Sequence, residues 1–327
     1  MKLAWIWLTL LFLGAMFCAL LFGSTPVQEM SWNTFIQVRL IRVLLAAIAG
    51  ASLAVAGALM QGLFRNPLAS PSIAGVNAGG IFGGQIALLL HQSLYPFLAR
   101  KLPEEMFLPM GVFVGSGFVL FLLLSFLKWM RTESEDLLMI LLMGLMLSNF
   151  FSALTGIITL IVSSDWALHR SVIAFSYGHL DGKGLNHLLL TLPLFLGGFF
   201  ASMLWSRSLD LMLSGEEEAT SLGVDLRHSR RWILTWTSIL VTAAVSVGGG
   251  VAFVGLVVPH FMRLWAGSKH QRLIPFCAIG GAIFLMSCDL ISRLPLWAAE
   301  LPLGSITAII GAPLFIYLFF NARKSTI

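Results

Sequence analysis

The sequence is dominated by a series of apolar stretches, most of them long enough to cross a membrane as a helix. A membrane-spanning helix needs about 20 mostly apolar residues, and the backbone inside lipid must satisfy its own hydrogen bonds. Ten such stretches follow one another along the chain: residues 3–22, 40–64, 73–91, 107–128, 137–162, 186–206, 232–247, 251–266, 274–292 and 303–321. The sequence therefore predicts an all-α polytopic membrane protein with ten transmembrane helices, in a single transmembrane domain covering residues 1–327.

The composition agrees with a membrane protein. The chain is 58% hydrophobic and 11% charged, whereas soluble domains carry roughly 25% charged residues. The net charge of +5 does not indicate nucleic-acid binding, because the basic residues are scattered between the apolar stretches. Cys18, Cys277 and Cys288 lie inside apolar stretches without metal-site spacing, so we expect them to pack as small apolar side chains. The first stretch is longer than the apolar core of a signal peptide and is interpreted as a retained span.

The distribution of Lys and Arg predicts the orientation of the chain. Ten spans place both termini on one side, and cytoplasmic connections carry an excess of basic residues. With a cytoplasmic N-terminus, thirteen basic residues lie inside: Lys2, Arg65, Lys128, Arg131, Arg207, Arg227, Arg230, Arg231, Arg263, Lys269, Arg272, Arg323 and Lys324. Seven lie outside: Arg39, Arg42, Arg100, Lys101, Arg170, Lys183 and Arg293. The bias predicts cytoplasmic termini, and the seven outer residues require an explanation of their own.

A long polar interruption, residues 208–232, separates the sixth and seventh predicted spans. Within it, Ser214 and Glu217 have the spacing of a capping box that starts a helix, and Gly223 suits a left-handed helix stop. The pattern predicts a helix of about two turns at residues 214–223, with Ala219 and Leu222 on one side. A short rigid helix between two spans is a suitable shape for pressing against another protein. A solvated loop that happens to be helical is the alternative interpretation.

The second predicted span shows how the helices are expected to pack. Small residues recur at every fourth position: Gly50, Ala54, Ala58 and Gly62. Such a stripe lets another helix approach closely. Two prolines in residues 65–71 then favour extended backbone, which lies at membrane depth only against protein or a watery cavity. Residues 243–264 repeat this order loosely, which predicts a weak inverted repeat of the kind found in transporters.

The fifth predicted span carries polar side chains along one helical face. Ser148, Ser152, Thr155 and Thr159 follow the helical period, and Asn149 lies beside the first of them. These groups are suited to lining a translocation pathway. They are equally suited to hydrogen bonds across helices or to carbonyl groups of their own helix.

Sequence motifs for an energy source or an enzymatic reaction are missing from the chain. The segment 177–185 is the nearest approach to a phosphate-binding loop and does not match its pattern, and His-Glu-x-x-His and Gly-x-Ser-x-Gly are also missing. Acidic residues inside the apolar stretches are few, and Asp289 has Arg293 one turn away as a partner. An ion-coupled carrier usually keeps ionisable groups in mid-membrane. We therefore predict that the chain is not an enzyme, holds no metal or cofactor of its own, and takes its energy from another subunit.

Four motifs, in order, resemble the iron-chelate and vitamin B12 permeases of the ATP-binding-cassette (ABC) importers. They lie at residues 39–80, 214–225, 255–264 and 300–316, so the resemblance spans the whole chain. The resemblance implies a type II importer fold in the bacterial inner membrane and a homodimer of the permease. It also implies two cytoplasmic ATPase subunits, which hold ATP and Mg²⁺, and a periplasmic or lipid-anchored binding protein that delivers the cargo.

The resemblance also implies roles for individual residues. The ATPase-coupling helix matches Ser214, Gly215, Glu216, Glu217, Ala219, Leu222 and Gly223. The arginines that dock the binding protein, by pairing with its acidic residues, match Arg39, Arg42 and Arg293. The translocation pathway is expected at Ser148, Asn149, Ser152 and Thr155, from the polar face of the fifth predicted span, and at Asn77, where the chain departs from the family pattern near the pore. Two departures from the vitamin B12 permease, at Asn77-Ala78 and at Leu137-Leu138, argue against vitamin B12 as the cargo.

The function expected from these features is import of a metal chelate, with an iron(III)–siderophore as the cargo. Haem or cobalamin import by the same kind of permease is the first alternative. An ion-coupled secondary carrier, and then a membrane enzyme, are alternatives from other classes. Transport that requires a co-expressed ATPase separates the importer from the carrier.

Overall fold

The computed structural model describes residues 2–22, 31–32, 35–98, 106–129, 137–294 and 300–324. Within these ranges the chain is helical, and every predicted span contains a helix. The helices that correspond to the ten stretches are α1 (Lys2–Leu21), α3 (Ile41–Leu63), α4 (Val76–Leu98), α5 (Phe107–Trp129), α6 (Leu137–Ile161), α8 (Leu185–Ser214), α10 (Leu226–Gly248), α11 (Val254–Ala266), α12 (His270–Ser292) and α13 (Leu303–Lys324). In the described ranges, seven helices are long and apolar enough to cross a membrane, whereas α4, α11 and α13 provide shorter apolar helices. The all-α membrane fold is thus confirmed, and the count of ten spans stays a prediction.

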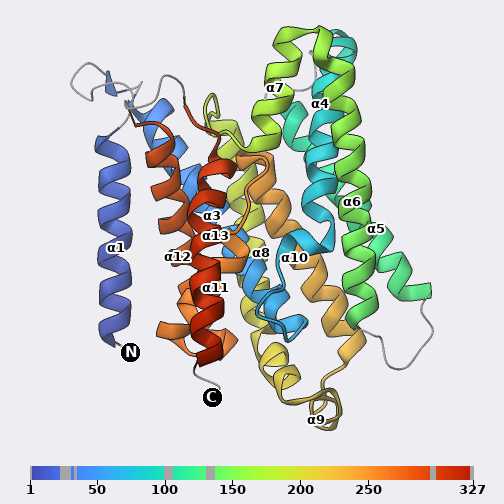
Figure 1. Cartoon of the computed structure of the whole chain (residues 1–327), viewed down its shortest axis with the longest axis vertical. Coiled ribbons are helices and arrows are strands. Elements are labelled where there is room, and N and C mark those ends of the chain that lie inside the picture. Colours follow the sequence, from blue (N-terminus) through green and yellow to red (C-terminus); the bar gives the residue numbers. More distant parts are fainter. Residues whose placement is uncertain are drawn as a thin grey trace.

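The helices run alongside one another, and both termini lie at one end of the bundle (Figure 1). The same end carries α9 (Glu216–Ser221), the short helix between α8 and α10. The opposite end carries α7 (Trp166–Tyr177), which follows α6 and a 3₁₀ turn, η5 (Val162–Ser164). Below, we call these two ends the α9 end and the α7 end. The predicted location of both termini on one side agrees with this arrangement.

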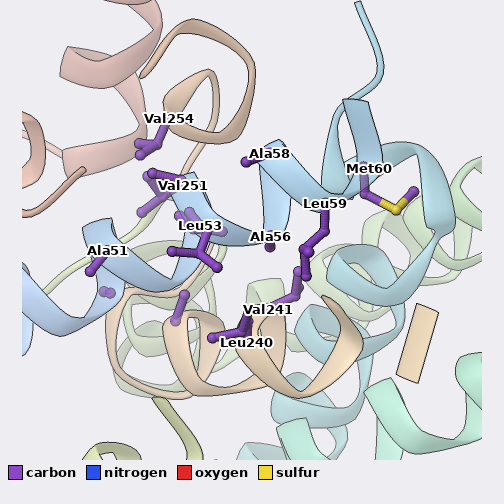
Figure 2. Close-up of a cluster of buried hydrophobic side chains, with 14 of the residues drawn as sticks. Ala51, Leu53, Ala56, Ala58, Leu59, Met60, Leu240, Val241, Val251 and Val254 are labelled. Atoms are coloured by element: carbon purple, nitrogen blue, oxygen red, sulfur yellow. The ribbon is translucent and has the colours of Figure 1, made fainter. Parts of the chain in front are cut away.

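The helix α3 forms the centre of the bundle, because nearly all of its residues are buried. It follows a π-helical segment, η2 (Phe35–Leu40), and it packs against α8, α10, α11 and α12. Figure 2 shows Leu59 of α3 lying toward Leu240 and Val241 of α10. These three side chains are almost completely buried and belong to one apolar core.

The predicted stripe of small residues is confirmed as a close helix contact. A Cβ atom at Gly50 would overlap the carbonyl oxygen of Gly281 in α12, and a Cβ at Gly281 would overlap Cβ of Ala54. Gly57 lies outside the predicted stripe and makes a similar contact, because a Cβ there would overlap the carbonyl oxygen of Gly255 in α11. Gly62, at the end of the stripe, lies against the ring of His270. The backbones of three helices therefore touch without intervening side chains, as small residues allow in membranes.

Two irregular connections face each other inside the bundle. The first, after α3, contains the 3₁₀ turn η3 (Pro71–Ala74) and ends at Gly75, which is left-handed. The second joins α10 to α11 and ends at Phe253, which has φ 64°. Residues 70–72 and 251–253 line a cavity of about 220 Å³ between the two connections. Residues 70 and 71 thus line a cavity as expected, whereas Arg65, Pro67 and Leu68 in the same predicted segment are exposed.

The helix α7 was not among the predicted elements. Its N-cap is Asp165, whose side chain accepts hydrogen bonds from the N–H groups of Ala167 and Leu168 (both 3.1 Å), and its C-cap is Gly178 with φ 85°. Both signals are present in the sequence. The segment is too short and too polar for a span, so a search for apolar stretches passes over it.

Candidate functional site

The short helix α9 begins one residue later than the capping box predicts. Ser214 is the last residue of α8, and the N-cap of α9 is Gly215, which has φ 144° and makes no side-chain capping hydrogen bond. The predicted capping box between Ser214 and Glu217 is therefore wrong. A hydroxyl group within the last turn of α8 does not point at the first N–H groups of α9.

The end of α9 matches its prediction. Gly223 has φ 85°, its N–H donates to the carbonyl of Thr220 (2.9 Å), and the N–H of Val224 donates to the carbonyl of Ala219 (3.0 Å). These two bonds form a Schellman motif, which places a left-handed residue, usually glycine, directly after the helix. The predicted left-handed stop at Gly223 is confirmed.

The two apolar residues of α9 point in different directions. Ala219 is completely buried against the bundle, whereas the side chain of Leu222 is 64% exposed. The prediction that they share one side is wrong, because Leu222 is the C-cap residue and has left the helical path. Glu217 is exposed as well. At the α9 end, the surface thus combines an exposed leucine with acidic side chains.

Glu216 connects α9 to two other helices. Its Oε1 atom lies 2.8 Å from Nη2 of Arg230 in α10 and 3.7 Å from Nη2 of Arg65, just beyond α3. From the sequence, both arginines are interpreted only as signals of membrane topology. A carboxylate at the start of a short helix near basic span ends is a weak signal for such a contact, since the partners are far apart in the chain.

A second group of charged residues lies at the α7 end, around Arg42. Nε of Arg42 donates to Oδ1 of Asp289 (2.9 Å), and its Nη1 and Nη2 atoms donate to the two carboxylate oxygens of Glu300 (3.1 and 2.9 Å). Asp181 lies 3.6 Å from Nη1. Arg42 is buried, and bidentate pairing of this kind holds an arginine in a fixed orientation.

The other two predicted docking residues, Arg39 and Arg293, are also buried. Nη1 of Arg39 donates to the last carbonyl groups of α1, at Leu20 and Leu21 (2.8 and 2.9 Å). Nη2 of Arg293 donates to the carbonyl of Ala19 (2.6 Å), and its Nε lies 3.1 Å from Oδ2 of Asp289. The predicted Asp289–Arg293 pair is confirmed.

The three arginines are thus brought together, and all three face inward. Arg39 and Arg293 bond to the last carbonyl groups of α1 and so join it to η2 and to the end of α12, whereas Arg42 joins α3 to α12 through Asp289. Among the partners of Arg42, the Asp181 side chain is 59% exposed and the Glu300 side chain is 25% exposed. The docking role of the arginines stays a prediction.

The predicted pathway residues on α6 divide into two groups. Ser148 donates from Oγ to the carbonyl of Ser72 in η3 (2.8 Å), and Thr155 donates to the carbonyl of Phe151 in its own helix (2.9 Å). These are the structural alternatives that the sequence left open. Asn149 and Ser152 are exposed on the open face of α6.

Asn77 lies half-buried in the first turn of α4, immediately after η3 and Gly75. Its Oδ1 atom is buried and has no hydrogen-bond partner among the described residues. In the described part of the chain, Asn77 forms no hydrogen bond with Asn149 or Ser152. Over the described ranges, no group of three or more His, Cys, Asp or Glu side chains is arranged to hold a metal ion.

Comparison with known proteins places these features in context. Residues 3–321 match the FecCD transport family. The hemin transport system permease protein HmuU of Yersinia pestis is 36% identical over 301 residues, which cover 92% of this chain and 87% of that protein. The Fe(3+) dicitrate transport system permease protein FecD of Escherichia coli is also 36% identical, over 97% of this chain and 98% of its own length.

A solved structure shows the same fold. It is that of a transporter described as of the metal-chelate ABC type, in an inward-facing conformation. The two chains are 31% identical and superpose with a TM-score of 0.85, over 98% of this chain and 99% of the other.

Proposed function

Because the chain belongs to the FecCD transport family of ABC importer permeases, we propose that it forms the membrane pathway for an iron(III)–siderophore. The observation that carries this proposal is the match over almost the full chain, with relatives named for hemin and for Fe(3+) dicitrate. Permeases of this family do not catalyse a reaction, and the energy comes from ATP and Mg²⁺ on a separate ATPase subunit. Haem is the second candidate cargo, because the hemin permease is as similar to this chain as the dicitrate permease.

In this proposal, the pathway lies between two copies of the chain. Asn149 and Ser152 sit on the open face of α6, among exposed apolar side chains such as Met146 and Phe150. Polar side chains in a membrane normally face protein or water rather than lipid. Gly156, one turn further along α6, also leaves room for a close neighbour, because a Cβ there would meet nothing within 4 Å. A second copy facing α6 supplies such a neighbour and encloses the polar groups.

The ATPase subunits are proposed to bind at the α9 end. The exposed Leu222 offers an apolar anchor, and the buried Ala219 fixes α9 against the bundle, so that a push on α9 is passed on. This orientation makes both termini cytoplasmic, in the inner membrane of a bacterium. The binding protein then approaches the α7 end, where a partner carboxylate has to compete with Glu300 for Arg42.

Reconstituted transport tests this function. The permease, its co-expressed ATPase and its binding protein are placed in liposomes, and uptake of a radiolabelled iron(III)–siderophore is compared with uptake of haem and of cobalamin. We expect uptake of the siderophore only when ATP is present on the side of the liposome membrane that carries the ATPase. Preferred uptake of haem makes the second candidate correct, and uptake driven by an ion gradient without the ATPase overturns the importer function.

A further inference from the structure

The contact at Glu216 differs from an ordinary surface ion pair, because one carboxylate oxygen is shared by two arginines from different helices. Arg230 is only 1% exposed, whereas the Glu216 side chain is 34% exposed. The Arg65 side chain is 30% exposed, and its Nη2 atom lies 3.7 Å from the same oxygen, Oε1 of Glu216. A buried guanidinium is held far more firmly than a surface one, so Glu216 attaches α9 to a fixed point in α10.

The backbone at Arg65 is a second and independent observation. Arg65 has φ 47°, and it is one of two non-glycine residues with positive φ in the described ranges, the other being Phe253. Its N–H donates to the carbonyl of Gly62 (3.3 Å), and the N–H of Asn66 donates to that of Gln61 (3.2 Å). These bonds form a Schellman motif at the end of α3, and Arg65 occupies the position at which glycine is usual.

The same motif ends α9, and there the left-handed residue is Gly223, with open space where a Cβ would lie. At the end of α3 the chain accepts an unfavourable conformation and keeps a side chain instead. An observed outlier of this kind supports a functional hypothesis about its side chain. That side chain pairs with Glu216.

The connection continues from Arg65 into the predicted pathway. Seven positions further along the chain, in η3, the carbonyl of Ser72 accepts the hydrogen bond of Ser148 (2.8 Å), which lies on α6 beside the exposed Asn149. In the other direction, Arg65 follows directly on α3, the buried centre of the bundle. The Glu216–Arg65 pair, a short stretch of backbone and the Ser148–Ser72 hydrogen bond therefore join α9 to both α3 and α6.

We infer that Arg65 and Arg230 are positioning residues that transmit a displacement of α9 to the rest of the bundle through Glu216. Arg230 anchors the carboxylate, and Arg65 passes its movement to the end of α3 and to η3. This inference rests on the proposed function, in which the ATPase moves α9. If the contact between Glu216 and Arg65 is removed, the ATPase still binds, but its movement no longer displaces the residues of the pathway.

The decisive variant is Arg65→Gly. Glycine fits the left-handed position without strain, so the fold is retained while the side chain is removed. We expect the ATPase to remain bound in a pull-down, while cargo transported per ATP hydrolysed in proteoliposomes falls about tenfold. Arg207→Gln, an exposed arginine in the last part of α8, is the matched control and is expected to change this ratio less than about twofold.

A double-mutant cycle separates transmission from general damage. Glu216→Gln is expected to lower the ratio as Arg65→Gly does, and the double variant is expected to be no worse than the poorer single variant. Glu218→Gln removes an exposed charge from the same helix and should have a smaller effect. Arg230→Gln completes the series if the variant is recovered from the membrane, and the other variants decide the question without it.

Two results overturn the inference. One is a wild-type transport ratio in Arg65→Gly, and the other is an additive effect in the double variant. Failure of the proposed function looks different, because the wild-type chain itself then shows no ATPase binding or no ATP-dependent transport.

Discussion

The two charged clusters at opposite ends of the bundle are built in opposite ways. At the α7 end, the buried Arg42 is surrounded by Asp289, Glu300 and Asp181, and its hydrogen bonds fix it within the bundle. At the α9 end, a single carboxylate, Glu216, is shared by two arginines and stays partly exposed. The first cluster holds α3 against α12, whereas the second joins a small surface helix to the bundle.

The difference indicates what each cluster contributes. Removing one member of a buried, mutually paired group leaves an uncompensated charge and costs much stability, whereas a partly exposed pair contributes little. Damage at the α7 end should therefore appear as loss of folded protein, and damage at the α9 end as loss of coupling between intact subunits.

The largest expected effect is that of Asp289→Asn. This change leaves Arg42 and Arg293 without the carboxylate that they share, at a cost of about 3–5 kcal/mol in unfolding free energy. The measurement is the midpoint of thermal unfolding of the purified permease in detergent. Asp181→Asn, at the 59% exposed edge of the same cluster, is the control and should cost at most about 1 kcal/mol. Equal stability of the two variants would show that the charged cluster around Arg42 does not stabilise the packing of α3 against α12.

The next effect in size is that of Gly223→Val. A β-branched residue at φ 85° is strained by about 1–3 kcal/mol, which is large for a helix of six residues. We expect the permease to remain folded and inserted, while pull-down of the ATPase and stimulation of its hydrolysis fall. Gly223→Asn, which tolerates a left-handed conformation better, should retain more of both. Wild-type behaviour of Gly223→Val would favour the solvated-loop interpretation of α9.

A smaller effect is expected from Glu300→Gln. If Arg42 docks an acidic binding protein, removal of its internal competitor should tighten that association by about 1 kcal/mol and accelerate encounter at low salt. Affinity measured by surface plasmon resonance at two salt concentrations checks this. Reversing the charge of Arg42 is a poorer test, because the residue is buried and the fold would suffer. Unaltered affinity in Glu300→Gln would confine Arg42 to its structural contacts.

The smallest effect is expected from Ser214→Ala. Because Ser214 ends α8 and does not cap α9, the change should alter stability by less than about 0.5 kcal/mol. ATPase association should be unaltered in the same pull-down that reports on Gly223→Val. A clear loss of association would mean that Ser214 itself contacts the ATPase.

The features that sequence predicted correctly depend on local rules. Apolar length identifies the helices, the repeat of small residues identifies the face of α3 that meets α12, and Gly223 identifies a left-handed stop. The pair Asp289–Arg293 is one turn apart in a single helix. In each case the residues that decide the structure lie within a few positions of one another.

The features that sequence missed depend on partners far away in the chain. Arg42 looks like an outer charge until Glu300, 258 positions later, is brought to it by the fold. From sequence, Arg65 is interpreted as a topology signal, because only the fold brings Glu216 into contact with it. Leu222 was assigned to the side of Ala219 because helical spacing was extended one residue past the end of the helix.

The glycine contacts of α3 with α11 and α12 have a consequence for how the protein moves. Side chains between two helices can absorb a small shift by changing rotamer, but touching backbones at Gly50 and Gly281, or at Gly57 and Gly255, offer no such adjustment. We therefore expect the three helices to shift together as one unit. A displacement of the α3 end by an ångström arrives on the far side of the membrane as a displacement of similar size.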